Sequence, residues 1–346
     1  MAACARAIVA EVSPCADVHR MLPEEAEGVS RLMHEVYGDT YPKKFVYDPV
    51  QVTRKAARGE ILPVTATSPA GEVIGFAAIT TYPGYPRIGL VGSLAVSPSS
   101  RARGLGGMIL RTLLAQSSGQ GFTSLTGGAF TTHPYSQRAI ERLGFVPTAI
   151  LPGSQPATIS FQEIAEKPVQ RETTVFYTRM TAPLVYGPQF LPEQHCAVIR
   201  DICQNLGIQV RVSRDGRAGQ EPAFVECSLN EETGAGMIWM RSSGPGQQEV
   251  LADAMSHLRS RGAAVLRLHI DARDPGTHAA VQVAEAAGFF FAGLLPDKDG
   301  LVLLFEHLLG TRINPGLIRM GSPAGERLLA TILSYPRVRG QPGLLP

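Results

Sequence analysis

The turn that decides the fold of this chain reads Arg101, Ala102, Arg103, Gly104, Leu105, Gly106 and Gly107. An apolar, β-prone run ends just before it at Val96, and a helix-prone run begins at Leu105. A glycine-rich turn between a strand and a helix points free backbone N–H groups at one place, where the helix dipole adds partial positive charge. The glycines leave room for an anion, and the two arginines add permanent charge. The turn therefore predicts a phosphate-binding loop.

Two common phosphate loops do not fit this spacing. A Walker A loop needs Lys followed by Ser or Thr after its last glycine, whereas Met108 follows Gly107 here, and the three-glycine dinucleotide spacing is missing too. The turn instead resembles the pyrophosphate loop of the GNAT superfamily of N-acetyltransferases, which reads Gln or Arg, two residues, Gly, one residue, and Gly or Ala. The resemblance covers about residues 18–150. An ordinary basic turn is the alternative for the loop taken alone.

The resemblance implies an acyl-CoA co-substrate, either acetyl-CoA or another short acyl-CoA, and no metal. The pyrophosphate would lie on the loop, and backbone groups at the end of the preceding strand would face the thioester. The residues implied as cofactor-binding are Leu94, Ala95, Val96, Arg101, Ala102, Arg103, Gly104, Leu105, Gly106 and Gly107.

The catalytic groups that the superfamily commonly uses are missing from their usual places. The strand over 88–96 contains no carboxylate to act as a base, and Ile140 stands where a tyrosine often protonates the departing thiolate. His133 is our candidate for proton transfer because its ordinary pKa lies near neutrality, and Tyr135 is a second candidate, as the acid. The alternatives are that His133 contacts the pantetheine arm or caps a helix, and that Tyr135 is a packed aromatic residue.

The regular elements expected around the loop alternate between helices and strands, in the order of a GNAT domain. This order predicts the α/β class, with a mixed central sheet flanked by helices. The expected helices cover residues 23–36, 49–58, 105–116 and 135–143, and the expected strands cover 62–67, 73–82, 88–96, 122–127 and 173–179.

The second half of the chain repeats this plan without the glycine-rich loop. Gly, Phe, four residues and then two aliphatic residues and Pro occur at 144–152 and again at 288–296. Counting back equal distances from Gly121 and Gly262 places Ser242 opposite Arg101, and Pro245 removes an N–H that a phosphate loop would use. We therefore predict two tandem GNAT-like domains, the second degenerate. The boundaries are 1–182 for the acyl-CoA-binding domain, 183–310 for the degenerate domain, and 311–346 for a helical and Pro/Gly-rich tail.

Two groups of polar and aromatic residues are candidates for substrate contacts. Three tyrosines and two aspartates within residues 37–48 would suit a cleft for a small cationic amine, or are solvated loop residues. Arg267, His269, Asp271 and Arg273 alternate along one strand, so they either reach a cleft between the domains or form a polar outer sheet face.

Composition narrows the class of protein. A length of 346 residues suits two domains, and a net charge of +2 without a basic stripe gives no reason to expect a nucleic-acid partner. The chain lacks the apolar run of about 18 residues that a membrane span needs. The five cysteines form no CxxC pair, which argues against a zinc site and favours a reduced, cytoplasmic protein.

These observations predict an acyl-CoA-dependent N-acyltransferase, most simply an N-acetyltransferase, that acts on the amine of a small metabolite. One alternative is a non-catalytic acyl-CoA-binding sensor, because the usual acid and base are missing. Another is different acyl-thioester chemistry, either decarboxylation or O-acyl transfer. The sequence does not specify the acceptor, the acyl chain length or the oligomeric state.

Overall fold

The computed structural model describes residues 16–101, 104–158, 169–214 and 216–334. Within these ranges no helix is long and apolar enough to span a bilayer, and no group of three His, Cys, Asp or Glu side chains is placed to hold a metal ion. The first half contains every element predicted around the glycine-rich turn, with ends shifted by a few residues. Its elements are β1 (Asp17–Arg20), α1 (Ala26–Tyr37), α2 (Pro49–Ala57), β2 (Ile61–Thr67), β3 (Val73–Tyr82), β4 (Tyr85–Val96), α3 (Leu105–Ser117), β5 (Ser124–Phe130), α4 (Tyr135–Glu141), β6 (Val146–Gln155) and β7 (Glu172–Met180).

Two strands of this half have no clear sequence signal. β1 has only four residues, and β6 contains Pro147 and Pro152, which are uncommon inside strands. The second half follows with β8 (Val185–Phe190), α5 (Cys196–Leu206), β9 (Gln209–Ser213), β10 (Phe224–Asn230), β11 (Ala235–Ser242), α6 (Gln247–Ser260), β12 (Val265–Asp271), α7 (Thr277–Ala286), β13 (Phe290–Pro296) and β14 (Leu301–Leu308), and α8 (Pro323–Ser334) comes last.

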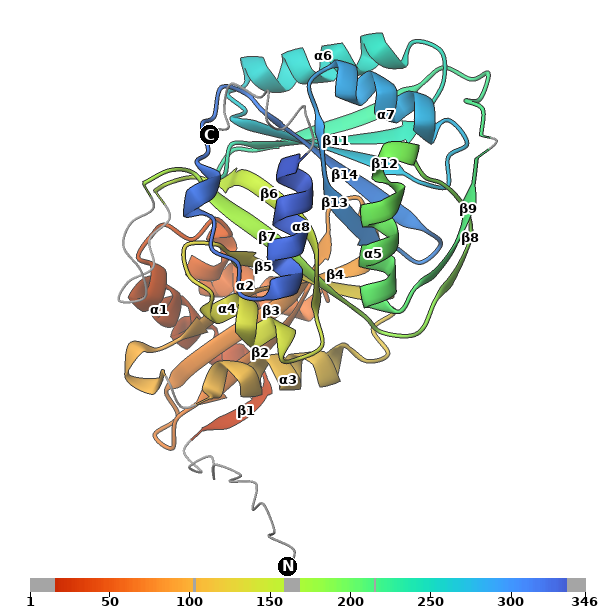
Figure 1. Cartoon of the computed structure of the whole chain (residues 1–346). Coiled ribbons are helices and arrows are strands. Elements are labelled where there is room, and N and C mark those ends of the chain that lie inside the picture. Colours follow the sequence, from red (N-terminus) through yellow and green to blue (C-terminus); the bar gives the residue numbers. More distant parts are fainter. Residues whose placement is uncertain (1–15, 102–103, 159–168, 215, 335–346) are drawn as a thin grey trace, which may run out of the picture.

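Within the described ranges, twelve strands form one mixed sheet, in the order β1-β2-β3-β4-β5-β7-β6-β13-β14-β12-β11-β10 (Figure 1). The predicted α/β class with a mixed central sheet flanked by helices is confirmed. The order β3-β4-β5-β7-β6 in the first half corresponds to β10-β11-β12-β14-β13 in the second, and in both halves one parallel pair, β4 with β5 or β11 with β12, is bridged by a helix.

Glycines mark equivalent turns in the two halves. Gly104 and Gly246 have φ of 76° and 77° and are the N-caps of α3 and α6, a left-handed conformation that glycine adopts without steric cost. The equivalence therefore pairs Gly246 with Gly104, and the sequence count that set Ser242 opposite Arg101 is wrong by one residue. The reason is that the segment from Gly246 to Gly262 is one residue shorter than the segment from Gly104 to Gly121, where Gly262 and Gly121 are the two glycines from which the count started.

The halves differ in their first strand–helix–strand unit. β1 pairs with β2 antiparallel at the edge of the large sheet, and α1 packs on β3 and β4. β8 pairs with β9 in parallel as a separate two-stranded sheet, and α5 packs on β6 and β7 of the first half. The second half thus uses its first helix to cover the other half of the molecule.

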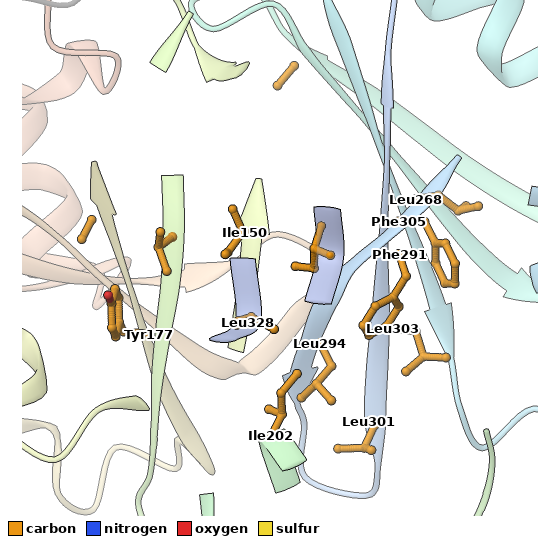
Figure 2. Packing of buried hydrophobic residues seen from close by; sticks show 14 of the residues in the cluster. Ile150, Tyr177, Ile202, Leu268, Phe291, Leu294, Leu301, Leu303, Phe305 and Leu328 are labelled. Atoms are coloured by element: carbon orange, nitrogen blue, oxygen red, sulfur yellow. The ribbon is translucent and has the colours of Figure 1, made fainter. Parts of the chain in front are cut away.

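The halves meet where β6 pairs with β13, at Ala149 and Gly293. Gly293 has a φ of 139°, and a Cβ on it would lie 2.2 Å from the Thr148 carbonyl oxygen and 2.4 Å from the Ala149 Cα. Around this junction one hydrophobic cluster contains side chains of both halves and of α8, including Ile150, Ile202, Leu294 and Leu328 (Figure 2). Since each fully buried aliphatic side chain contributes about 1.5–3 kcal/mol, this shared core holds the halves together.

Arg267 and His269 of β12 are buried in the contact between the halves, where they form neither a cleft lining nor an outer face. Asp271, at the end of β12, and the exposed Arg273 beyond it instead pair with each other. Arg267 donates from Nε to Glu306 at 2.6 Å, and both residues are buried. The Tyr82 hydroxyl lies 2.9 Å from His269 Nε2, and His269 Nδ1 lies 3.0 Å from the Ile238 carbonyl oxygen. Burial lowers the pKa of His269 to about 3, so this ring stays neutral.

The described part of the predicted tail packs on the first half. Gln137, fully buried in α4, donates to the Arg319 carbonyl at 2.8 Å and accepts from the Gly321 N–H at 2.7 Å. The Arg319 N–H donates to the Thr131 carbonyl at 3.1 Å, just past the end of β5. The tail therefore fixes the segment that carries His133.

Replacing Gly293 with Ala will lower the free energy of unfolding by about 2–4 kcal/mol, because the added Cβ collides with the backbone of β6. Gly310→Ala is the control, since Gly310 also has positive φ (74°) but has open space around its Cα. Urea unfolding of both variants measures the difference. Equal losses of unfolding free energy in the two variants would show that the close approach of β6 and β13 does not make Gly293 essential for stability.

Candidate active site

β4 and β5 part near their carboxyl ends. They pair in parallel only from Ile88 to Val91 and from Ser124 to Gly127, although β4 continues to Val96 and β5 to Phe130. On the side away from β3, the backbone of residues 92–96 therefore has no ladder partner from β5. Backbone N–H and C=O groups need partners, so this opening suits a ligand that offers them.

A bulge at Ser93 accompanies the parting of the strands. Ser93 has a φ of 55°, which is uncommon for a residue other than glycine, and the β3–β4 register shifts there. Two tyrosines from the α1 side hold the bulge. The Ser93 N–H donates to the Tyr41 hydroxyl at 2.8 Å, and the Tyr37 hydroxyl donates to the Leu94 carbonyl at 2.8 Å. Both tyrosines are buried, so they are not solvated loop residues, and burial raises the pKa of each hydroxyl.

The N-terminus of α3 lies beside this opening. Gly104 caps the helix without a side-chain hydrogen bond, so the first N–H groups of α3 have no side-chain cap. A Cβ on Gly106 would lie 3.8 Å from the Val96 side chain and 3.9 Å from that of Leu94. The structure thus brings the predicted loop and the predicted strand end together. Ala102 and Arg103 lie outside the described residues.

Arg101 braces the loop against β4. Its Nε donates to the Val96 carbonyl at 3.3 Å, and its charge acts on the hydroxyl of Tyr37. The guanidinium therefore stands at the carboxyl end of β4, next to the first turn of α3, where it adds positive charge to the helix dipole.

The corresponding loop of the second half is covered by the chain itself. The Ser243 N–H donates to the Asp274 carboxylate at 2.8 Å, and the Ala223 N–H donates to the Pro245 carbonyl at 2.9 Å. A Cβ on Gly244 would lie 2.1 Å from the Glu221 carbonyl oxygen. A carboxylate and a crossing segment thus occupy the space in front of this loop.

His133 follows two threonines that a buried carboxylate holds in place. Glu172 Oε1 accepts from the N–H groups of Thr131 and Thr132 at 2.8 and 3.1 Å, and its carboxylate also accepts from both threonine hydroxyls. Burial lowers the pKa of His133, although the charge of Glu172 opposes this, so the ring is suited to accept a proton near neutrality. Tyr135 is 66% exposed, with its ring 5.4 Å from that of His133.

Residues 27–145 match a protein-family model described as the acetyltransferase (GNAT) family. This segment is a GNAT domain. The match covers α1 to α4, including the bulge, the glycine-rich loop and His133. No curated protein matches the chain with significant sequence similarity.

Solved structures similar to this chain include three acetyltransferases. The N-acetyltransferase from Staphylococcus aureus Mu50 is 15% identical, with 47% of this chain and 96% of that chain covered, at a TM-score of 0.39. The GNAT superfamily phosphinothricin acetyltransferase from Sinorhizobium meliloti, solved with acetyl-CoA, is 18% identical, with 48% and 88% covered and a TM-score of 0.38. The ribosomal-protein-alanine N-acetyltransferase from Brucella melitensis is 14% identical, with 47% and 99% covered and a TM-score of 0.38.

The first half contains residues beside the opening between β4 and β5 that sequence reasoning missed. The bulge at Ser93 has no local signal. Glu172 lies 40 or more positions after Thr132 and Thr131, and the pairing of β5 with β7 brings its carboxylate to them. Lys43 belongs to a Lys-Lys pair that reads as exposed, yet it is half-buried beside β4, where burial lowers its pKa to about 8. Ile140, at the position of the usual tyrosine acid, packs into the space that Gly127 leaves open.

Arg101→Glu will weaken CoA binding about 10- to 100-fold, because a carboxylate then stands beside the site proposed for a pyrophosphate. Isothermal titration calorimetry with CoA measures the change. Arg54→Glu makes the same charge change on the exposed surface of α2 and serves as the control. If both variants bind CoA equally well, the phosphate-loop assignment is wrong.

Proposed function

We propose that the GNAT domain transfers an acyl group, most simply acetyl, from CoA to the amine of a small metabolite. The family match supports acyl transfer. The observation that carries the proposal is the N-terminus of α3, where the N-cap Gly104 supplies no side-chain cap, beside the parted ends of β4 and β5. A pyrophosphate would lie on the N–H groups of Gly104 to Gly107, and the pantetheine arm would extend along Leu94–Val96 between the two strands.

The residues of this opening suit the steps of the reaction. Backbone N–H groups of β4 that face no strand are available to donate to the oxyanion that forms as the amine attacks the thioester carbonyl. His133, directly or through water, takes the proton of the attacking amine. The new C–N bond forms, the C–S bond breaks, and the thiolate of CoA leaves and is protonated by Tyr135 or by water.

We further propose that residues 183–310 are a degenerate copy of the GNAT-like domain at 1–182, with 311–346 as a tail. The repeated strand order and the paired N-cap glycines support duplication. In the copy, Asp274 and the segment around Glu221 stand where a phosphate would have to approach. We therefore expect one CoA site in each chain.

Incubation with acetyl-CoA and mixtures of small amines will release free CoA thiol in an amine-dependent manner, which a thiol-reactive chromophore measures. A sensor that binds acyl-CoA without catalysis is the second candidate, favoured by the lack of a carboxylate on β4 and by Ile140 in place of a tyrosine. Tight CoA binding with no thiol release from any acceptor would establish the sensor and refute transfer.

His133→Ala will lower kcat about 100-fold or more, because the amine loses its proton acceptor. In the wild-type protein kcat/KM will fall as the pH drops through the pKa of His133, which burial holds below its ordinary value of 6.5. Steady-state rates from pH 5 to 9 measure both effects, and Tyr135→Phe tests the acid separately. Full activity of His133→Ala would remove this residue from the mechanism.

A further inference from the structure

Two glycines leave a bare stretch on the face of the sheet that carries α1. Gly92 of β4 and Gly128 of β5 follow the last paired residues, Val91 and Gly127, and Gly128 is exposed in the middle of its strand. A hydrophobic cluster covers the sheet on each side of this bare stretch. One cluster lies under α1 and includes Met33 and Phe76, and the other lies at the contact with the second half and includes Tyr82, Phe176 and Trp239.

Lys43 is the cation beside this stretch. Its Nζ would lie 3.5 Å from a Cβ on Gly92, and it donates to the Thr80 hydroxyl at 3.3 Å. In the part of the chain that the structure describes, no carboxylate lies within ion-pair distance of this ammonium group. Its environment is therefore half-buried and lacks a negative charge.

The neighbouring lysine is in the opposite situation. Lys44 is exposed, donates to the Asp39 carbonyl at 2.7 Å and pairs with Glu232 of the second half at 3.6 Å. Arg171, the next cation at this contact, donates to the Thr233 carbonyl. The turn between β10 and β11 thus supplies acceptors for Lys44 and Arg171, and among the described residues it supplies none for Lys43.

A half-buried ammonium group without a counter-ion loses hydration and gains no compensating charge interaction. The lowering of the pKa of Lys43 to about 8 has burial as its cause, with no opposing carboxylate. Even so, Lys43 is protonated in most molecules at pH 7. A ligand carboxylate placed over Gly92 and Gly128 would supply the missing negative charge, with a charge-assisted hydrogen bond.

We propose that Lys43 binds a carboxylate of a reacting molecule over the bare stretch of β4 and β5. The inference rests on the proposed acyl transfer and narrows its substrate class. The carboxylate has two possible sources, namely an acceptor such as an amino acid, or the free end of a dicarboxylic acyl group on CoA. The Ser93 bulge follows Gly92 directly, so such a carboxylate lies within a few ångströms of the backbone that faces the thioester.

The test compares matched substrates on wild-type protein, Lys43→Met and Lys44→Met. The first arm uses acetyl-CoA with α-amino acids and their carboxamides, and the second uses succinyl-CoA and acetyl-CoA with one simple amine. We expect Lys43→Met to lower kcat/KM about 10- to 100-fold for the carboxylate-bearing member of one arm and to leave its partner unchanged. Lys44→Met should behave as wild type, and Lys43→Arg should restore part of the loss.

Equal effects of Lys43→Met on both members of each pair, or no effect on any of them, would overturn the proposal. An equal loss would instead place Lys43 in the chemistry common to all acceptors. If no substrate pair is turned over while CoA still binds, the proposed transfer fails, and direct calorimetry of glycine and succinate on CoA-loaded protein decides the role of Lys43. Binding that Lys43→Met abolishes supports the proposal, and binding equal in both proteins refutes it.

Discussion

The parting of β4 from β5 is the constraint on which the rest of the structure depends. While paired, the two strands satisfy each other's backbone groups. Beyond Val91 the carbonyls of Leu94 and Val96 accept from Tyr37 and Arg101 instead, and β5 supplies no ladder partner there. The Ser93 bulge turns β4 at this point, and two buried tyrosines hold the bulge. The first turn of α3 opens beside the same strand end. A long ligand with an anionic end and an acyl end fits this arrangement of donors.

The second half shows what the same strand plan becomes when the opening is closed. Its helix α6 also begins at a left-handed glycine, yet the Asp274 carboxylate and the segment around Glu221 cover the preceding loop. The second half instead has a structural role. It extends the sheet through the close contact at Gly293, buries His269 against Tyr82, and sends α5 across to β6 and β7.

The buried and half-buried charged side chains of this region differ in whether another residue of the chain neutralises or hydrogen-bonds their charge. Glu172 is buried but accepts hydrogen bonds from two threonines, and Arg267 is buried but pairs with Glu306. Both groups have hydrogen-bond partners within the chain and stabilise its structure. Among the described residues the one hydrogen-bond partner of Lys43 is the Thr80 hydroxyl, and this difference, which exposure alone does not show, is the basis on which we propose Lys43 as a ligand-binding group.

The sequence by itself determined the local features of this protein. Apolar periodicity predicted the elements of the first half except β1 and β6, and the glycine spacing predicted the loop at Gly104, because both act over a few residues. Only the tertiary structure decided the rest. The Ser93 bulge, the clamp of Glu172 behind His133 and the isolation of Lys43 depend on contacts between residues 37 or more positions apart, and no local pattern encodes which strand, helix or carboxylate will lie opposite a given side chain.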